Sequence, residues 1–229
     1  MGTITGKEEF WGAVKLSDQD LAYINDSPTM VKDLLQYQQD FNNKIVNSMK
    51  VGSGGGTLFN GSYVEFASDY AQWDSSTLVG QLAHEIGHYV NQAADTAFTN
   101  EYQVSPNDPN AYFIDAMIGL HREGDAVYNN YVVQQEILAA TGNQTEIYLA
   151  GASHIDRTST GLQQLLDAQH SFDQTEGYTS SEDKNLMIEQ AMGVYATLPG
   201  SAIPNQTYYD YYGKINGAKA PAQAQHSPM

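Results

Sequence analysis

The stretch LVGQLAHEIGHYV, residues 78–90, places an apolar side chain at every fourth position. Residues four apart lie above one another on an α-helix, so these side chains would form one apolar stripe. The stripe consists of Leu78, Leu82, Ile86 and Val90. Good N-cap residues stand just upstream at positions 74–76, which read Asp, Ser and Ser. The sequence therefore predicts a long helix that begins near Asp74 and buries this face.

The segment before this helix combines helical patterns with a hairpin signal. Residues 17–50 have helical spacing of apolar residues, interrupted at 25–28, where Ser27 can cap a second helix that starts at Pro28. A glycine-rich turn follows, and no Lys follows it as a phosphate-binding loop would need. Asn60-Gly61 then separates the runs 57–59 and 62–67, which predicts a β-hairpin.

The segment after it is expected to be helical. A loop containing two prolines is expected at 104–110, and further helices are expected at 111–140, 160–170 and 181–197. The last residues are small and polar, which is typical of a disordered tail. We therefore expect a single α+β domain over residues 1–217, mostly helical with a small early sheet, and a tail over 218–229.

The net charge of the chain argues against two classes of binding partner. Its 229 residues include 10 Lys and Arg against 27 Asp and Glu, a formal net charge of −17. Nucleic acids and anionic membranes attract cationic surfaces, so this charge argues against both partners. Cysteine is absent, which excludes disulfides and thiolate metal sites. With neither a membrane-spanning run nor a signal-peptide pattern, we expect a protein that is cytoplasmic as made.

Within the predicted helix, residues 84–88 read His-Glu-Ile-Gly-His. His84 and His88 are four residues apart, so both imidazoles lie on one side of the helix. Neutral imidazole is a good zinc ligand, and two of them can fill half of a tetrahedral site. Glu85 lies one residue further round and can reach a metal-bound water without binding the metal. The pattern predicts a zinc ion with a general base beside it.

The alternative interpretation is a pair of unrelated histidines on a surface helix. A His-Glu-x-x-His pattern would arise by chance only about 0.007 times in a chain of this composition. In addition, Gly80 and Gly87 each cost about 1 kcal/mol of helix stability relative to Ala. Because the glycines are present in spite of this cost, we interpret the small residues of the helix, Ala83 and Gly87 among them, as allowing close approach of backbone or substrate.

The run from Leu82 to His88 resembles the active-site helix of the zincin metallopeptidases. The resemblance implies a zincin-like fold and a hydrolase of peptide bonds, with one Zn²⁺ per chain held by His84 and His88 and with Glu85 as catalytic base. Residues 89–95 do not provide the Gly and third His of the metzincin subgroup. The resemblance is therefore to gluzincins, in which a carboxylate further along the chain is the third ligand.

Four downstream carboxylates are candidates for that ligand: Glu101, Glu123, Asp125 and Glu136. Glu123 is preferred, because it lies within the helix expected at 111–140 and a gluzincin glutamate comes from a second helix. Ala116 and Gly119 lie on the same face of that helix and would let it pack closely against the motif helix. Glu101 is expected in a loop, which would hold a ligand poorly. Asp125 can instead support a ligand histidine through a hydrogen bond.

A gluzincin also provides a Tyr or His that stabilises the oxyanion. The chain has 16 tyrosines and further histidines at His121, His154 and His170, so the sequence does not select one. The run 207–213, Thr-Tyr-Tyr-Asp-Tyr-Tyr-Gly, is interpreted as a packed aromatic cluster in preference to a substrate-binding segment. We expect the hairpin arm 62–67 to be the edge strand that pairs with an extended substrate.

The order of elements over about the first 140 residues also resembles metallopeptidase domains of bacterial secretion-system spike proteins and polymorphic toxins. This resemblance implies an exported effector, with a secretion carrier or a cognate immunity protein as partner. The expected substrate is a peptide or protein. Two alternatives are kept: a peptidoglycan amidase or endopeptidase that cleaves stem peptides, and a metal-bound interaction module without catalysis.

Overall fold

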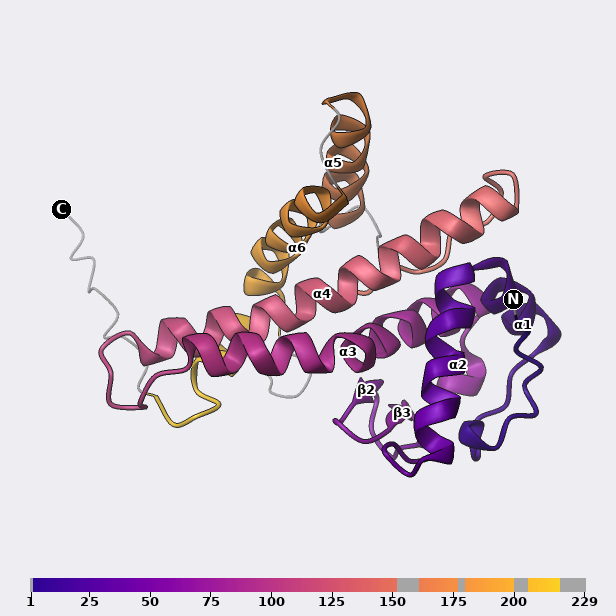
Figure 1. Cartoon of the computed structure of the whole chain (residues 1–229), viewed down its shortest axis with the longest axis horizontal. Coiled ribbons are helices and arrows are strands. Elements are labelled where there is room, and N and C mark those ends of the chain that lie inside the picture. The colour runs from indigo at the N-terminus through magenta and orange to yellow at the C-terminus, as the bar shows by residue number, and fades with distance from the viewer. Residues whose placement is uncertain (1, 152–160, 177–179, 200–205, 219–229) are drawn as a thin grey trace.

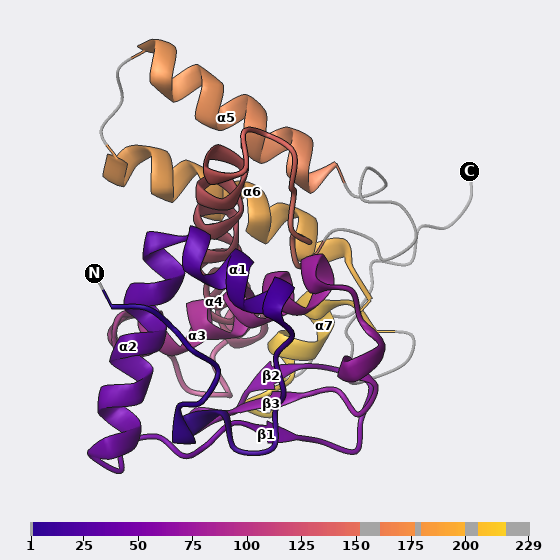
Figure 2. The same cartoon turned by 90° about the vertical axis from the view of Figure 1, so that its right-hand side faces the viewer.

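The computed structural model describes residues 2–151, 161–176, 180–199 and 206–218. Two long helices run side by side along the longest axis of the molecule, α3 (Ser75–Tyr102) and α4 (Ala111–Ala140) (Figure 1). The N-terminal helices and a small sheet lie against one end of this pair, and α5 and α6 project from α4 on the other side (Figure 2). The predicted class, mostly helical with a small early sheet, is confirmed.

The first two helices begin where the sequence predicts. A short 3₁₀ turn (Glu9–Trp11) precedes α1 (Asp18–Asp26), whose N-cap Ser17 forms a capping box with Asp20. Ser27 then caps α2 (Pro28–Asn42) by accepting a hydrogen bond from the Met30 amide at 3.0 Å, with Pro28 in the first turn.

The sheet confirms the hairpin and corrects the position of its edge. The strands are β1 (Lys50–Val51), β2 (Leu58–Phe59) and β3 (Val64–Phe66), in the order β1-β3-β2. Strand β3 is therefore central, parallel to β1 and antiparallel to β2. The expectation that residues 62–67 form the edge is wrong; the edge beside α3 is β2. A two-residue strand carries too little alternation to be ranked as an edge from sequence.

Helix α3 follows a second 3₁₀ turn (Tyr70–Gln72) and has the predicted N-cap, since the Asp74 carboxylate accepts from the Thr77 amide at 2.7 Å. Leu78, Leu82 and Ile86 are buried as the apolar stripe predicts. Val90 is the exception at 37% exposed: the buried cluster extends along α3 as far as Tyr89 and does not include Val90.

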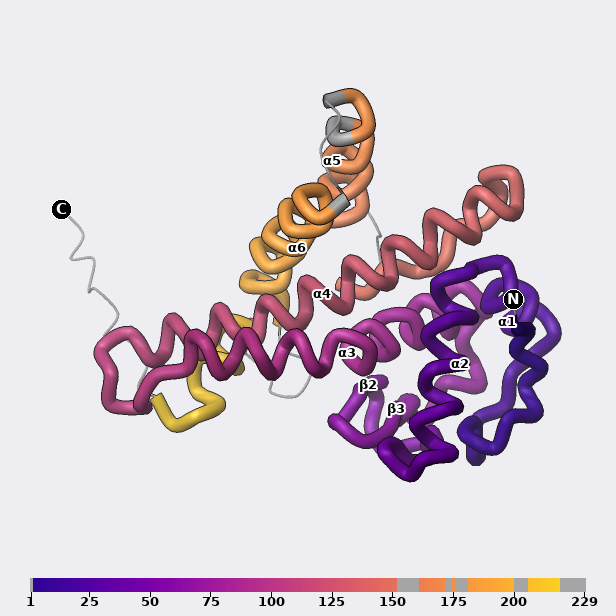
Figure 3. Tube along the Cα trace, viewed as in Figure 1, coloured from indigo at the N-terminus to yellow at the C-terminus, as the bar shows by residue number. Residues whose placement is uncertain are grey.

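The rest of the chain packs on α4. Helices α5 (Leu162–Glu176) and α6 (Ser180–Thr197) form a hairpin, and α7 (Tyr208–Gly213) returns to the side of α4 near its start (Figures 2 and 3). Two large buried clusters result, one of α1, α2, the sheet and α3, the other of α4, α5 and α6. Helix α4 joins them, because Val133 and Ile137 belong to the first cluster and Leu120 and Val127 to the second.

Two further expectations concern the C-terminal tail and membrane-spanning helices. Ala218 is buried against Tyr112, whereas the rest of the predicted tail, 219–229, lies outside the described residues. None of the described helices combines the length and the apolar character needed to cross a bilayer.

Candidate metal centre

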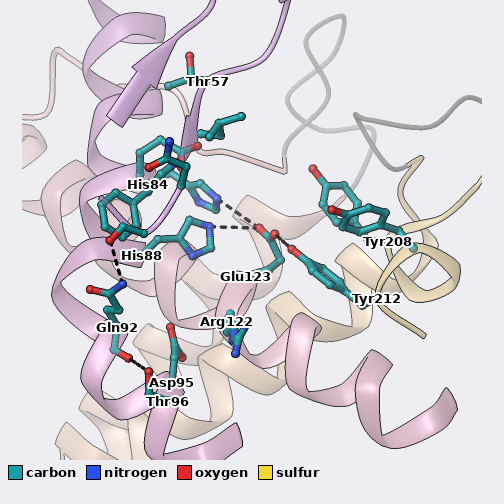
Figure 4. Close-up of a pocket in the computed structure, with 16 residues that line it drawn as sticks. Thr57, His84, His88, Gln92, Asp95, Thr96, Arg122, Glu123, Tyr208 and Tyr212 are labelled. Carbon is teal, nitrogen blue, oxygen red and sulfur yellow. Dashed lines mark hydrogen bonds and ion pairs between the residues drawn. The ribbon is translucent and has the colours of Figure 1, made fainter. Parts of the chain in front are cut away.

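His84, His88 and Glu123 meet between the two long helices (Figure 4). One oxygen of Glu123, Oε2, lies 3.3 Å from Nε2 of His84 and 3.6 Å from Nε2 of His88. The two histidines come from consecutive turns of α3 and the carboxylate from the middle of α4. The structure therefore brings the preferred third candidate, Glu123, to the two motif histidines.

A close crossing of α3 and α4 brings these side chains together. A Cβ atom added at Gly87 would lie 2.8 Å from Cα and 2.9 Å from the carbonyl oxygen of Ala126 on α4. Nearby, the Asn129 side-chain amide donates to the Ala83 carbonyl at 3.0 Å. The close approach predicted for Ala83 and Gly87 is thus a helix–helix contact, which holds Glu123 opposite the imidazoles.

The three side chains fit a metal ion. Their ligand atoms all lie within 4.8 Å of one another, and His84 and Glu123 are buried. Ligands about 2.0–2.1 Å from a tetrahedral zinc ion are about 3.3–3.4 Å apart, close to both separations from Glu123. Nitrogen and carboxylate donors are also the ligand types of catalytic zinc sites. This group can therefore hold a metal ion.

The charges of the group depend on one another. Burial alone would raise the pKa of the Glu123 carboxyl, but hydrogen bonds from His84 and His88 lower it below its ordinary value. Burial would lower the pKa of His88, but the hydrogen bond and the charge of Glu123 raise it to about 9. In the metal-free protein, Glu123 is thus an anion that accepts from the imidazoles.

Glu85 lies beside the group without joining it. Its Oε2 accepts a hydrogen bond of 2.6 Å from the backbone amide of Phe59 on β2, the edge strand. Burial raises the pKa of the Glu85 carboxyl above its ordinary value, although the neighbouring His84 and His88 act in the opposite direction. A raised pKa makes a carboxylate a stronger base, which favours its taking a proton from a nearby water.

Helix α7 closes the other side of the site. The Tyr212 hydroxyl donates to Oε1 of Glu123, and the Tyr212 ring packs directly against Gly119, where an added Cβ would lie 2.1 Å from the ring. Gly119 thus makes room for Tyr212 and not for α3, which corrects the sequence interpretation. On the third side, the Tyr195 ring is parallel to that of His84, with centroids 6.2 Å apart.

A cleft with a volume of about 580 Å³ is lined by His84, Glu85, His88, Glu123 and Tyr212, among others. Its walls are the strand and turn at 57–61, the histidine face of α3, part of α4, and α7. The aromatic run interpreted as packing contributes three tyrosines to this lining: Tyr208, Tyr211 and Tyr212. The sequence shows that this run is unusual, but the contact of Tyr212 with Glu123 spans 89 positions and has no local signal.

The other carboxylate candidates lie elsewhere. Glu136 accepts hydrogen bonds from Ser27 and Thr29 and so supports the start of α2. Glu101 is exposed in the last turn of α3, not in a loop. Asp125 lies beside His121 and Lys184, so its predicted support of a ligand histidine is not seen.

His121 and His170, the other two histidines that the structure describes, are not part of this centre. His121 lies near Asp95 and Asp125, and His170 lies near Asp183 on α6. His154 lies outside the described residues.

Comparisons with family models, with curated proteins and with solved structures find no match to this chain.

Proposed function

We propose that the protein is a zinc-dependent hydrolase of peptide bonds, with His84, His88 and Glu123 as the metal ligands. The proposal rests chiefly on the convergence of two imidazoles on one carboxylate oxygen at 3.3 and 3.6 Å, inside a cleft. Three protein ligands and an open position are characteristic of catalytic zinc sites, whereas structural sites have four protein ligands.

Glu85 is the general base of this proposal. A zinc ion held by the three ligands would supply a Lewis acid and a bound water of lowered pKa. Glu85 lines the same cleft, and its hydrogen bond to the Phe59 amide fixes the direction of its carboxylate. From there Glu85 would accept a proton from the attacking water and return it to the leaving amine.

The edge strand supports a peptide as substrate. Strand β2 pairs with β3 on one side only and borders the cleft on the other, next to Glu85. An extended peptide could lie along this edge and bind backbone groups other than the Phe59 amide, which already donates to Glu85. One of its carbonyl groups would then lie before the histidines. Tyr208, Tyr211 and Tyr212 across the cleft would contact its side chains or the oxyanion.

The experiment compares zinc-loaded wild type with Glu85→Gln on an unfolded protein and on purified peptidoglycan. Wild type should cleave at least one of them, and the variant should be slower by about 10² to 10⁴ while it keeps its zinc. Glu101→Gln, at an exposed position on the same helix, is the matched control and should remain active. If zinc-loaded wild type cleaves neither substrate, the interaction module is the better interpretation.

A further inference from the structure

Two turns after His88, α3 contributes a second group of metal-binding side chains. Asp95 from α3 faces His121 and Asp125 from α4, and their ligand atoms lie within 4.8 Å of one another. Nδ1 of His121 is 3.4 Å from Oδ2 of Asp125 and 3.9 Å from Oδ1 of Asp95. We propose that these three residues bind a second divalent transition-metal ion of the zinc class.

The buried polar atoms of this group lack hydrogen bonds. Asp95 is 6% exposed and Asp125 is 3% exposed. Within the part of the chain that the structure describes, neither Oδ1 of Asp95 nor Nδ1 of His121 has a hydrogen-bond partner. Burying such atoms is unfavourable unless something compensates for the lost water. A cation between them would bind both.

The charged groups around Asp95 and Asp125 are compatible with such a cation. Lys184 from α6 lies 2.9 Å from Oδ1 of Asp125, so it balances one of the two carboxylates. That contact uses the oxygen that does not face His121, and Oδ2 stays directed toward the imidazole. Among the described residues, Asp95 makes its ion pair with His121, at 3.9 Å, and neither a Lys nor an Arg pairs with it. A metal would satisfy both carboxylates and a neutral imidazole at once.

The arrangement of His121 favours the metal. Its ring is stacked on that of Phe98, with centroids 4.1 Å apart and planes 12° apart, so the imidazole has a fixed orientation. The ligand set of one nitrogen and two carboxylate oxygens suits zinc and its neighbours in the first transition series. Calcium and magnesium are disfavoured because they take oxygen ligands almost alone.

The second ion would lie at the end of the cleft. Asp95 and Arg122 line the same cleft as His84 and His88, and Figure 4 shows Asp95 on the same helix beyond His88. Three protein ligands leave at least one position for water or for a group of the substrate. The ion would also tie α3 to α4 beyond the contact made at Gly87. This proposal does not depend on the hydrolase proposal, because it concerns metal binding alone.

The test counts zinc ions. The full chain is stripped with a chelator, titrated with zinc chloride alone, desalted and analysed for metal content. Wild type should retain about two equivalents. Asp95→Asn, which keeps the side-chain volume, and His121→Ala should each retain about one. His170→Ala, which removes a histidine that lies beside a single carboxylate, Asp183, among the described residues, is the matched control and should retain two.

A variant that lacks the first metal site, His84→Ala, distinguishes the second-site proposal from the first. His84→Ala should still bind one zinc ion, and zinc at 100 times its Kd should raise the melting temperature of this variant by about 5 °C. The same variant with Asp95→Asn added should show neither effect. One equivalent in wild type and none in His84→Ala would overturn the second site and leave the first intact. Two equivalents in a folded Asp95→Asn would overturn it as well.

Discussion

Asp33 is a buried carboxylate outside the metal centre, and it should make stability depend on pH. Its Oδ2 has no hydrogen-bond partner among the described residues, and burial raises the pKa of Asp33 from 3.8 to about 6, with Lys32 opposing and Glu136 reinforcing the shift. The unfolded chain therefore loses this proton at lower pH than the folded protein does. The contribution of Asp33 to stability thus falls as pH rises from about 4 to about 6.

Asp33→Asn removes that dependence. Between pH 5 and pH 8, the free energy of unfolding of the variant should rise by about 1 kcal/mol relative to wild type. Urea unfolding at the two pH values measures the difference. A gap between the two proteins that is the same at both pH values would show that Asp33 titrates normally in the folded protein.

A second prediction for single residues concerns the third metal ligand, for which Glu123 and Glu136 were both candidates. Glu123→Ala should lower zinc affinity at the motif site, because it removes the oxygen on which both histidines converge. Glu136→Ala should leave zinc binding unchanged and cost about 1–2 kcal/mol of stability, since it removes acceptors at the start of α2. Metal titration and urea unfolding of both variants test this, and the reverse pattern would move the ligand role to Glu136.

At the scale of elements, the metal centre depends on how closely α3 and α4 cross. Gly87→Ala would place a methyl group 2.8 Å from Cα of Ala126, so α4 must shift and move Glu123 away from the histidines. Zinc affinity should fall by about tenfold or more, although no ligand is changed. Isothermal titration with zinc measures the effect.

The control for this change is Gly193→Ala on α6. Among the described residues, no atom lies within 4 Å of an added Cβ at Gly193. The substitution should raise stability by about 0.5–1 kcal/mol through helix propensity and leave zinc affinity alone. Equal zinc affinity in Gly87→Ala and wild type would show that the crossing does not position Glu123.

Elements with strong local signals were predictable from the sequence. Asp74, Ser27 and the Asn60-Gly61 turn mark their elements through caps and backbone preferences that act within a few residues. Which strand forms the edge depends on how β1, β2 and β3 pair, which residues 62–67 do not encode. Likewise, His84 and His88 share a helix and are readable as a pair, whereas Tyr212 reaches Glu123 only through the path of the whole chain.

At the scale of the molecule, a metal ion would join two halves that have separate cores. The histidines lie on α3, which belongs to the first buried cluster, and Glu123 lies on α4, which also forms the second. Ligands that bind only the folded state stabilise it by mass action, by about 4 kcal/mol at 1,000 times the Kd. Removing zinc with a chelator should therefore lower the melting temperature by about 5–10 °C.

Calorimetry with and without chelator measures this difference. Re-addition of zinc should restore the higher melting temperature, and magnesium should not, because its preferred ligands are oxygens. A melting temperature that does not respond to zinc would mean that no ion ties α3 to α4 in the folded protein.

Anomalous diffraction at the zinc edge, from crystals of the zinc-loaded protein, shows whether His84, His88 and Glu123 hold a zinc ion. We expect an anomalous peak about 2.0–2.2 Å from Nε2 of both histidines and from Oε2 of Glu123, with Glu85 near the peak but outside bonding distance. A zinc-loaded crystal without a peak between these side chains, or with Glu85 bonded to the metal in place of Glu123, would contradict it.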